Sequence, residues 1–326
     1  MTLSSLIAFA LVFLAASALI SLLLGIGLRR GEHRIRILGA RAEQRAATLT
    51  LGGPPVLALV LVGCLAAHSA RSLLAGTDHC EAHAHHLHLC LVHGEAWMTR
   101  PWAVALLAVV AGFVVVRLLQ IAWAHVDAQR AAWRFRRMGE PLAEAHRCVV
   151  VPLDEPLVFT AGALSPTVVI SRGAWARLNP NERQAVIEHE LAHIANGDLW
   201  RRALLAIAAC FAAPGRAAFA LRLWDRSAER ICDRQAADAV GRPTVVAGAI
   251  VALARGMSRR GVPAGAVFAA ACSITERVHS LLNAEPDGAG SATRLSWWFF
   301  GAGVGLALAS AAFSEPLHHV LETILG

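Results

Sequence analysis

Four apolar stretches of the sequence are long enough to cross a lipid bilayer as helices. They run from about Leu3 to Leu28, Pro54 to Leu74, Trp102 to Ala124 and Leu295 to Phe313. A spanning helix needs about 20 apolar residues, and the first stretch lacks the basic start and cleavage site of a signal peptide. Because 56% of the residues are hydrophobic and only 16% charged, we expect an α-helical multi-pass membrane protein.

The distribution of arginine predicts the orientation of these spans. The arginines near the membrane cluster after the first span and after the third: Arg29, Arg30, Arg34, Arg36, Arg41, Arg45, Arg130, Arg134, Arg136 and Arg137. The segment from Gly76 to Thr99 contains none. Positively charged loops stay in the cytoplasm, so we expect this segment and both chain termini outside. The expected organisation is three spans with a cytoplasmic Arg-rich loop over 1–124, a cytoplasmic domain over 125–294, and a fourth span with a short outer tail over 295–326.

The expected cytoplasmic domain begins with strands and continues with helices. Three short β-branched runs separated by Pro and Gly predict a small antiparallel sheet or hairpin. These runs are Cys148–Val151, Leu157–Thr160 and Thr167–Ser171. Further on, Asn179 is placed to cap a helix, with Pro180 at its first position and Glu182 completing a capping box.

The predicted helix carries the sequence His189-Glu190-Leu191-Ala192-His193. Residues four apart lie on one helix face, so His189 and His193 can bind the same Zn²⁺ ion. Glu190 would lie beside that ion, where its carboxylate can take a proton from the attacking water and deliver it to the leaving amine. The motif also occurs in helices whose histidines only pack in a core, so a third ligand has to be found.

Glu229 and Asp233 are the best candidates to complete a site. A metzincin would need glycine at 196 and histidine at 199, but the chain has Asn196 and Leu199. Glu229 would make a His₂Glu site for one catalytic zinc ion with an open fourth position. Asp233 would accept a hydrogen bond from the far nitrogen of a ligand histidine. Alternatively, these carboxylates form an exposed face paired with neighbouring arginines, namely Arg226, Arg230 or Arg234.

Several motifs occur together between Val149 and Gly241, and the combination resembles a known family. They are Phe159–Gly162, Val168–Gly173, Leu178–Glu182, the HELAH segment and Glu229-xxx-Asp233. This set resembles the bacterial antirepressor metallopeptidases, which include the β-lactam sensor-transducers of the Bla and Mec regulatory systems. The resemblance implies a protein of the bacterial inner membrane. Its cytoplasmic domain would be an α+β gluzincin domain (HExxH…ExxxD). It also implies a protein substrate, either a winged-helix transcriptional repressor or the chain itself.

The sequence departs from the sensor-transducers in one respect, and two other functions stay open. Those proteins carry a large outer penicillin-binding domain, whereas about a dozen residues follow Phe313 here, so β-lactam acylation is not the expected signal. HtpX-like and CAAX prenyl proteases share the HExxH…ExxxD motif, which leaves a quality-control or maturation protease as an alternative function. A non-catalytic metal-sensing transducer is the third reading, but it gives Glu190 no role. A homodimer is compatible with all three, and the dispersed arginines predict no direct contact with nucleic acid.

The predicted outer loop is rich in potential metal ligands. Six histidines lie in it: His79, His83, His85, His86, His88 and His93. A transition-metal-binding loop and a flexible polar loop both explain them. Cys80 and Cys90 share the loop and could pair in an oxidising compartment.

Two roles at the expected active site have several candidates. Many gluzincins steady the oxyanion with a tyrosine or histidine, and this chain has no tyrosine. The candidates for that role are His125, His146, Arg230 and Arg234. Phe159–Gly162 can be read either as an edge strand that takes an extended substrate or as an ordinary strand of the sheet.

Overall fold

The computed structural model describes residues 3–74, 100–142, 147–255, 273–283 and 286–312. The predicted outer loop lies outside these residues, and so do its potential ligands and one oxyanion candidate. Those residues are His79, His83, His85, His86, His88, His93, Cys80, Cys90 and His146.

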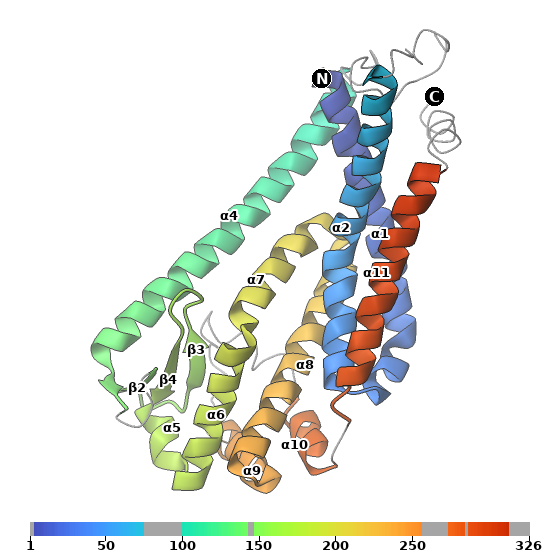
Figure 1. Cartoon of the computed structure of the whole chain (residues 1–326). Helices are drawn as coiled ribbons and strands as arrows, with labels where there is room; N and C mark the ends of the chain where they lie inside the picture. The colour runs from blue at the N-terminus through green and yellow to red at the C-terminus, as the bar shows by residue number, and fades with distance from the viewer. Residues whose placement is uncertain (1–2, 75–99, 143–146, 256–272, 284–285, 313–326) are drawn as a thin grey trace.

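Helices make up most of the described chain. The helices before the sheet are α1 (Leu3–Ile37), α2 (Ala40–Leu74) and α4 (Pro101–Met138). Those after it are α5 (Arg172–Arg177), α6 (Pro180–Asn196), α7 (Asp198–Ala208), α8 (Pro214–Val240), α9 (Pro243–Ala254), α10 (Ile274–Leu282) and α11 (Ala289–Ala312). Figure 1 shows α1, α2 and α11 side by side, whereas α4 slants away from them toward the small sheet.

Three of the described helices are long and apolar enough to cross a membrane. Their apolar stretches are Ser5–Ile37, Ala40–Ala67 and Pro101–Met138. They overlap the first three predicted spans, but the second begins before the predicted Pro54 and the third extends beyond the predicted Ala124. The fourth predicted span falls on α11, which packs on α2 but is not among these three; it stays a prediction. The segment expected to form an Arg-rich loop is helical apart from a turn at residues 38–39.

The turn between α1 and α2 depends on a glycine. Gly39 has a φ of +107°, and a Cβ atom there would lie 2.1 Å from the carbonyl oxygen of Pro286. Next to it, Arg41 donates a hydrogen bond of 2.7 Å to Asp287. A side chain at position 39 would therefore push the segment before α11 away from the α1–α2 turn.

The sheet is mixed, which corrects the expected antiparallel arrangement. Its strands are β1 (Glu140–Pro141), β2 (Cys148–Val151), β3 (Val158–Ala161) and β4 (Thr167–Ser171), in the order β1-β2-β4-β3. β3 and β4 form the expected antiparallel pair, but β2 runs parallel to β4. All five residues of β4 are buried, so β4 takes the inner position and the chain passes over it between β2 and β3.

The two faces of the sheet pack against different helices. One face lies on α4, where the rings of Phe135 and Phe159 meet edge to face with centroids 5.6 Å apart. On the other face, Val168 and Ile170 pack against α6. Helix α6 begins as the sequence predicts, because the Asn179 side chain and Glu182 form a capping box and Pro180 is its first residue. These contacts fix α6 beside β3.

Helix α8 packs against the first two helices. Trp224 is fully buried in a core that includes Leu51 of α2 and Leu28 of α1. Beyond this core, Glu43 of α2 is an ion-pair partner of both Arg226 and Arg230 of α8. The Glu43 and Arg230 side chains are 1% and 0% exposed, so this pairing ties α2 to α8 inside the protein.

We expect Glu43→Gln to destabilise the fold by about 3 kcal/mol or more, because removing one partner of a buried ion pair leaves the other charge uncompensated. Thermal unfolding of the detergent-purified protein measures the change. Glu32→Gln is the matched control: Glu32 also contacts Arg226, at 3.1 Å, but its side chain is 34% exposed. An exposed pair contributes about 1 kcal/mol at most, so equal effects of the two variants would contradict the role given to Glu43.

Candidate metal centre

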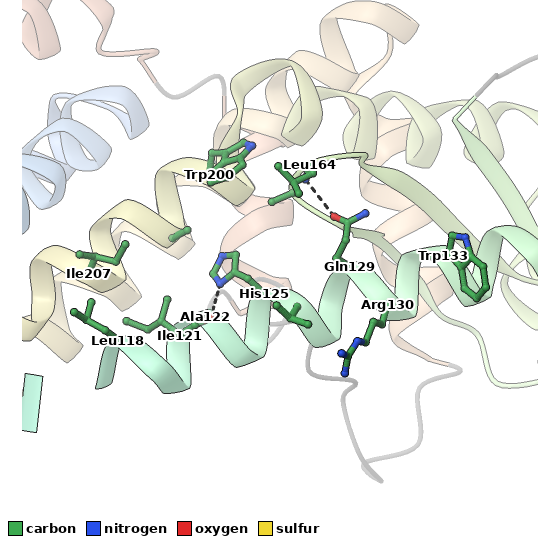
Figure 2. Close-up of a pocket in the computed structure, with 13 residues that line it drawn as sticks. Leu118, Ile121, Ala122, His125, Gln129, Arg130, Trp133, Leu164, Trp200 and Ile207 are labelled. Carbon is green, nitrogen blue, oxygen red and sulfur yellow. Dashed lines mark hydrogen bonds between the residues drawn. The ribbon is translucent and has the colours of Figure 1, made fainter. Parts of the chain in front are cut away.

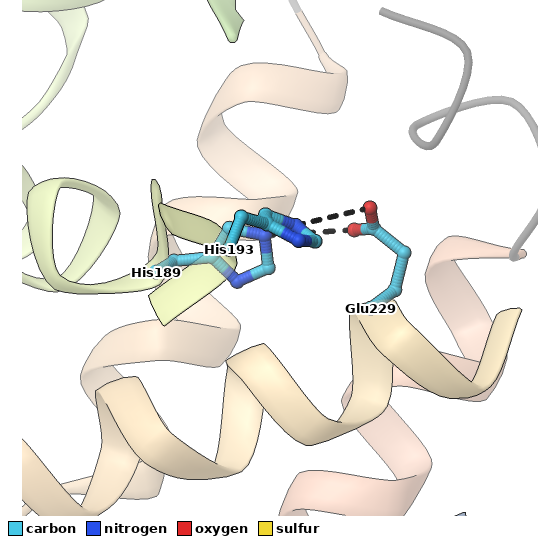
Figure 3. A group of neighbouring side chains, drawn as sticks. All are labelled: His189, His193 and Glu229. Atoms are coloured by element: carbon cyan, nitrogen blue, oxygen red, sulfur yellow. Dashed lines mark ion pairs between the residues drawn. The ribbon is translucent and has the colours of Figure 1, made fainter. Parts of the chain in front are cut away.

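His189 and His193 from α6 and Glu229 from α8 converge at one point (Figure 3). The Nε2 atom of His189 lies 3.6 Å from one carboxylate oxygen of Glu229, and that of His193 lies 3.5 Å from the other. All three residues are buried. The i, i+4 spacing of the histidines turns both rings toward α8, as the sequence predicts.

These distances fit a metal ion. Around a tetrahedral ion with bonds of about 2.0–2.1 Å, neighbouring ligand atoms lie about 3.3–3.4 Å apart. Each histidine lies at about this distance, 3.6 and 3.5 Å, from a different oxygen of Glu229, so a shared ion would need one of these oxygens to be its ligand. Two imidazoles and one carboxylate are a donor set typical of catalytic zinc.

A second group of potential ligands shares His193. It consists of His193, Asp198 and Cys232, and the Cys232 sulfur lies 3.3 Å from Nδ1 of His193. Nδ1 of His193 and Oδ2 of Asp198 lie 2.8 Å apart, which is a hydrogen-bonding distance and is shorter than the roughly 3.3 Å between two ligand atoms of a tetrahedral ion. The group of His189, His193 and Glu229 is therefore the better candidate.

Each histidine has a carboxylate behind it. Nδ1 of His193 donates to Oδ2 of Asp198 at 2.8 Å. Nδ1 of His189 lies 2.9 Å from Oδ1 of Asp233, although the ring N–H is too bent for a regular hydrogen bond. Such partners fix the orientation of a ligand ring. The Asp233 contact is the one expected from the sequence.

Asp198 contacts His193 rather than a neighbouring arginine. Its place near Arg201 and Arg202 predicts a structural salt bridge, but Arg202 instead pairs with Asp225 at 2.6 Å. Gly197 is the reason: with φ +66° and ψ +31° it ends α6 in the left-handed conformation. This left-handed residue separates α6 from α7, and fully buried Asp198 at the start of α7 lies against His193.

Arg277 of α10 binds both acidic residues on α8. Its guanidinium lies 2.8 Å from Glu229 and donates two hydrogen bonds, of 2.8 and 2.6 Å, to Asp233. Burial would raise the pKa of the Glu229 carboxyl, but Arg277 and the two histidines outweigh it and hold that pKa well below its usual range. Arg277 likewise lowers the pKa of Asp233 against the effect of burial. Both carboxylates therefore stay charged in a buried site.

The carboxylates of Glu229 and Asp233 do not form an exposed face. Both are buried, and the arginine that binds them is Arg277. Two of the neighbouring arginines point elsewhere, since Arg226 and Arg230 are ion-pair partners of Glu43. The structure therefore favours the metal-centre reading of this pair.

Glu190 lies between α6 and the sheet. Thr160 of β3 donates a hydrogen bond of 2.7 Å to its carboxylate, and Glu190 itself is buried. The sequence singles out Phe159–Gly162 but not the role of Thr160. β3 is the last strand of the described sheet, and three of its four residues are buried, which leaves both readings of Phe159–Gly162 open.

The candidates for stabilising the oxyanion make contacts with different parts of the protein. Arg230 is buried against Glu43, which directs its charge toward α2. His125 lies on α4 and donates to the carbonyl oxygen of Ile121 at 2.8 Å. Neither contact places these residues at the metal centre, and the role stays open.

We expect Asp198→Asn to lower metal affinity by about ten- to a hundredfold, the usual effect of losing a partner of a ligand histidine. Competition with a chromophoric chelator measures the affinity. Asp225→Asn is the matched control, because Asp225 is also buried and ion-paired but contacts Arg202. A loss of affinity in both variants, or in neither, would show that Asp198 does not act through His193.

Comparison with known proteins places these features in one family. The family described as BlaR1 peptidase M56 matches residues 78–281, which is more than half of the chain and includes the whole candidate metal centre. No curated protein matches the chain. No solved structure matches it either. The match confirms the resemblance to the Bla and Mec regulatory metalloproteases, and three apolar helices agree with a membrane-associated protein. The chain therefore belongs to the BlaR1 peptidase M56 family of metallopeptidases.

Proposed function

We propose that this protein is a zinc-dependent endopeptidase of the gluzincin type, with its active site on the cytoplasmic side of the bacterial inner membrane. The observation that carries the proposal is the convergence of His189, His193 and Glu229, with Glu190 directly after His189 in the chain. A purely structural metal site needs no base next to its ligands. The presence of Glu190 next to His189 therefore favours an enzyme over a metal-sensing transducer.

The residues of the site would have different roles in peptide-bond hydrolysis. When bound, the ion polarises the scissile carbonyl and lowers the pKa of a water molecule. The Glu190 carboxylate takes the proton of the attacking water and passes it to the leaving amine. Thr160 fixes the direction of that carboxylate through its 2.7 Å hydrogen bond.

The outer edge of β3 is suited to bind the substrate backbone. β3 pairs with β4 on one side and ends the described sheet on the other. An extended peptide can add to such an edge through main-chain hydrogen bonds. A peptide in that position would pass Thr160 and therefore Glu190, which brings a scissile bond close to the base.

A cytosolic protein is the substrate that we propose, either a winged-helix repressor or the chain itself. The support is the family, whose regulatory members the chain resembles, and the arginine distribution, which predicts a cytoplasmic location for residues 125–294. In that orientation the peptidase reaches soluble targets without a membrane-embedded substrate path.

Comparison of native protein N-termini in cells that carry the wild-type chain or Glu190→Gln tests the proposal. We expect a small set of new termini with the wild type only, from a co-encoded DNA-binding repressor or from this chain. Many new termini from unrelated membrane proteins would indicate a quality-control protease instead. Identical termini under all conditions, in a folded protein with bound metal, would contradict the peptidase.

A further inference from the structure

An apolar cavity of about 560 Å³ lies between α4 and α7 (Figure 2). Its walls are formed mainly by side chains of these two helices: Leu118, Ile121, Ala122, Trp200, Ala203 and Ile207. Leu164, on the turn after β3, also lines the cavity. The volume is within the range of small-molecule sites, and neither the metal ligands nor Glu190 line it.

One wall of this cavity belongs to a candidate membrane span. α4 has 38 residues, of which Ala103 and Ala132 are buried. The helix slants relative to α1, α2 and α11 (Figure 1), and a slanted helix keeps more residues inside the hydrocarbon layer than an upright one. Trp123 and Trp133 are 68% and 55% exposed and would mark the headgroup level. If the two tryptophans mark that level, the cavity would lie at the boundary between the membrane and the predicted cytoplasmic domain.

The cavity also has a cationic residue in its lining. Arg130 stacks over Trp123 at 5.8 Å, and within the part of the chain that the structure describes it has no carboxylate partner. Arg134, one turn further along, lies 3.8 Å from Asp127. An unpaired guanidinium beside an apolar cavity suits an amphiphile with an anionic head.

We propose that this cavity binds one anionic phospholipid, with an acyl chain against the apolar walls and the phosphate at Arg130. A peptide fits the cavity less well, because most of the lining is apolar and its two polar uncharged side chains, His125 and Gln129, already bond to the backbone of Ile121 and Leu164. An acyl chain needs no hydrogen-bond partners. Lipid binding to the cavity would not depend on peptidase activity. The lipid proposal can therefore fail while the proposed peptidase function holds, and the peptidase function can fail while lipid binding holds.

Native mass spectrometry of the full chain, released from nanodiscs of equal parts phosphatidylglycerol and phosphatidylcholine, tests the proposal. We expect the wild type to retain one phosphatidylglycerol. Arg130→Gln should lower this retention about fivefold, the factor for one cation near anionic headgroups. Ala122→Trp, which fills the cavity from an exposed position of α4, should abolish it. Arg134→Gln is the control with the same loss of charge on the same helix and should retain the lipid.

Three results would overturn the proposal. The first is equal retention of the two lipids by the wild type. The second is an Arg130→Gln variant that behaves like Arg134→Gln. The third is a bound peptide mass in place of a lipid, lost in Ala122→Trp, which would assign the cavity to substrate. Thermal unfolding of each variant shows that it is folded before its lipid content is compared.

Discussion

Glu190→Gln is expected to lower kcat/KM for a cleaved protein by about 10²–10⁴-fold, the usual contribution of a general acid–base group. Glutamine keeps the size of the side chain and can still meet the Thr160 hydroxyl, but it cannot accept the proton of the attacking water. The measurement compares cleavage by wild type and variant in liposomes, with metal content determined for both. Metal content should be unchanged, because Glu190 is not among the three converging ligands.

Glu188→Gln is the matched control for this variant. Glu188 lies two residues earlier on α6 and is partly exposed, so the substitution makes the same chemical change on the same helix away from the ligands. We expect nearly wild-type cleavage. A Glu190→Gln protein that binds metal and cleaves at the wild-type rate would rule out Glu190 as the base.

His193→Ala is expected to reduce bound metal from one ion per chain to nearly none and to abolish cleavage. One imidazole and one carboxylate remain, and most protein zinc sites use at least three protein ligands. Elemental analysis after dialysis against a weak chelator measures the metal, and a cleavage assay on the same sample measures activity. The loss should exceed the ten- to hundredfold change expected for Asp198→Asn.

His33→Ala is the control for the loss of a histidine, since His33 is an exposed residue of α1. It should leave both metal content and cleavage unchanged. Full metal content in His193→Ala would mean that the ion binds elsewhere, and the outer histidine-rich loop would then become the first place to look.

Local spacing was enough to predict the centre of the candidate site. The i, i+4 pairs at His189 and His193 and at Glu229 and Asp233 fix which side chains share a helix face. The capping box at Asn179 fixes where α6 begins. These features depend on helix geometry alone, so they can be read before any tertiary contact is known.

Contacts made by distant segments could not be predicted in the same way. Arg277 reaches Asp233 from 44 residues further along the chain, and no motif marks it. Asp198 is close in sequence, but its direction depends on the left-handed turn at Gly197. The parallel pairing of β2 with β4 depends on which strand is buried on both sides, and short apolar runs do not reveal that.

The central claim is that one ion binds His189, His193 and Glu229, and X-ray absorption at the zinc edge of the purified full-length protein tests it most directly. We predict a shell of nitrogen and oxygen neighbours at about 2.0–2.2 Å, with imidazole scattering and no sulfur. A zinc–sulfur distance of about 2.3 Å that disappears in Cys232→Ser would place the ion at His193, Asp198 and Cys232 instead. That result would contradict the account.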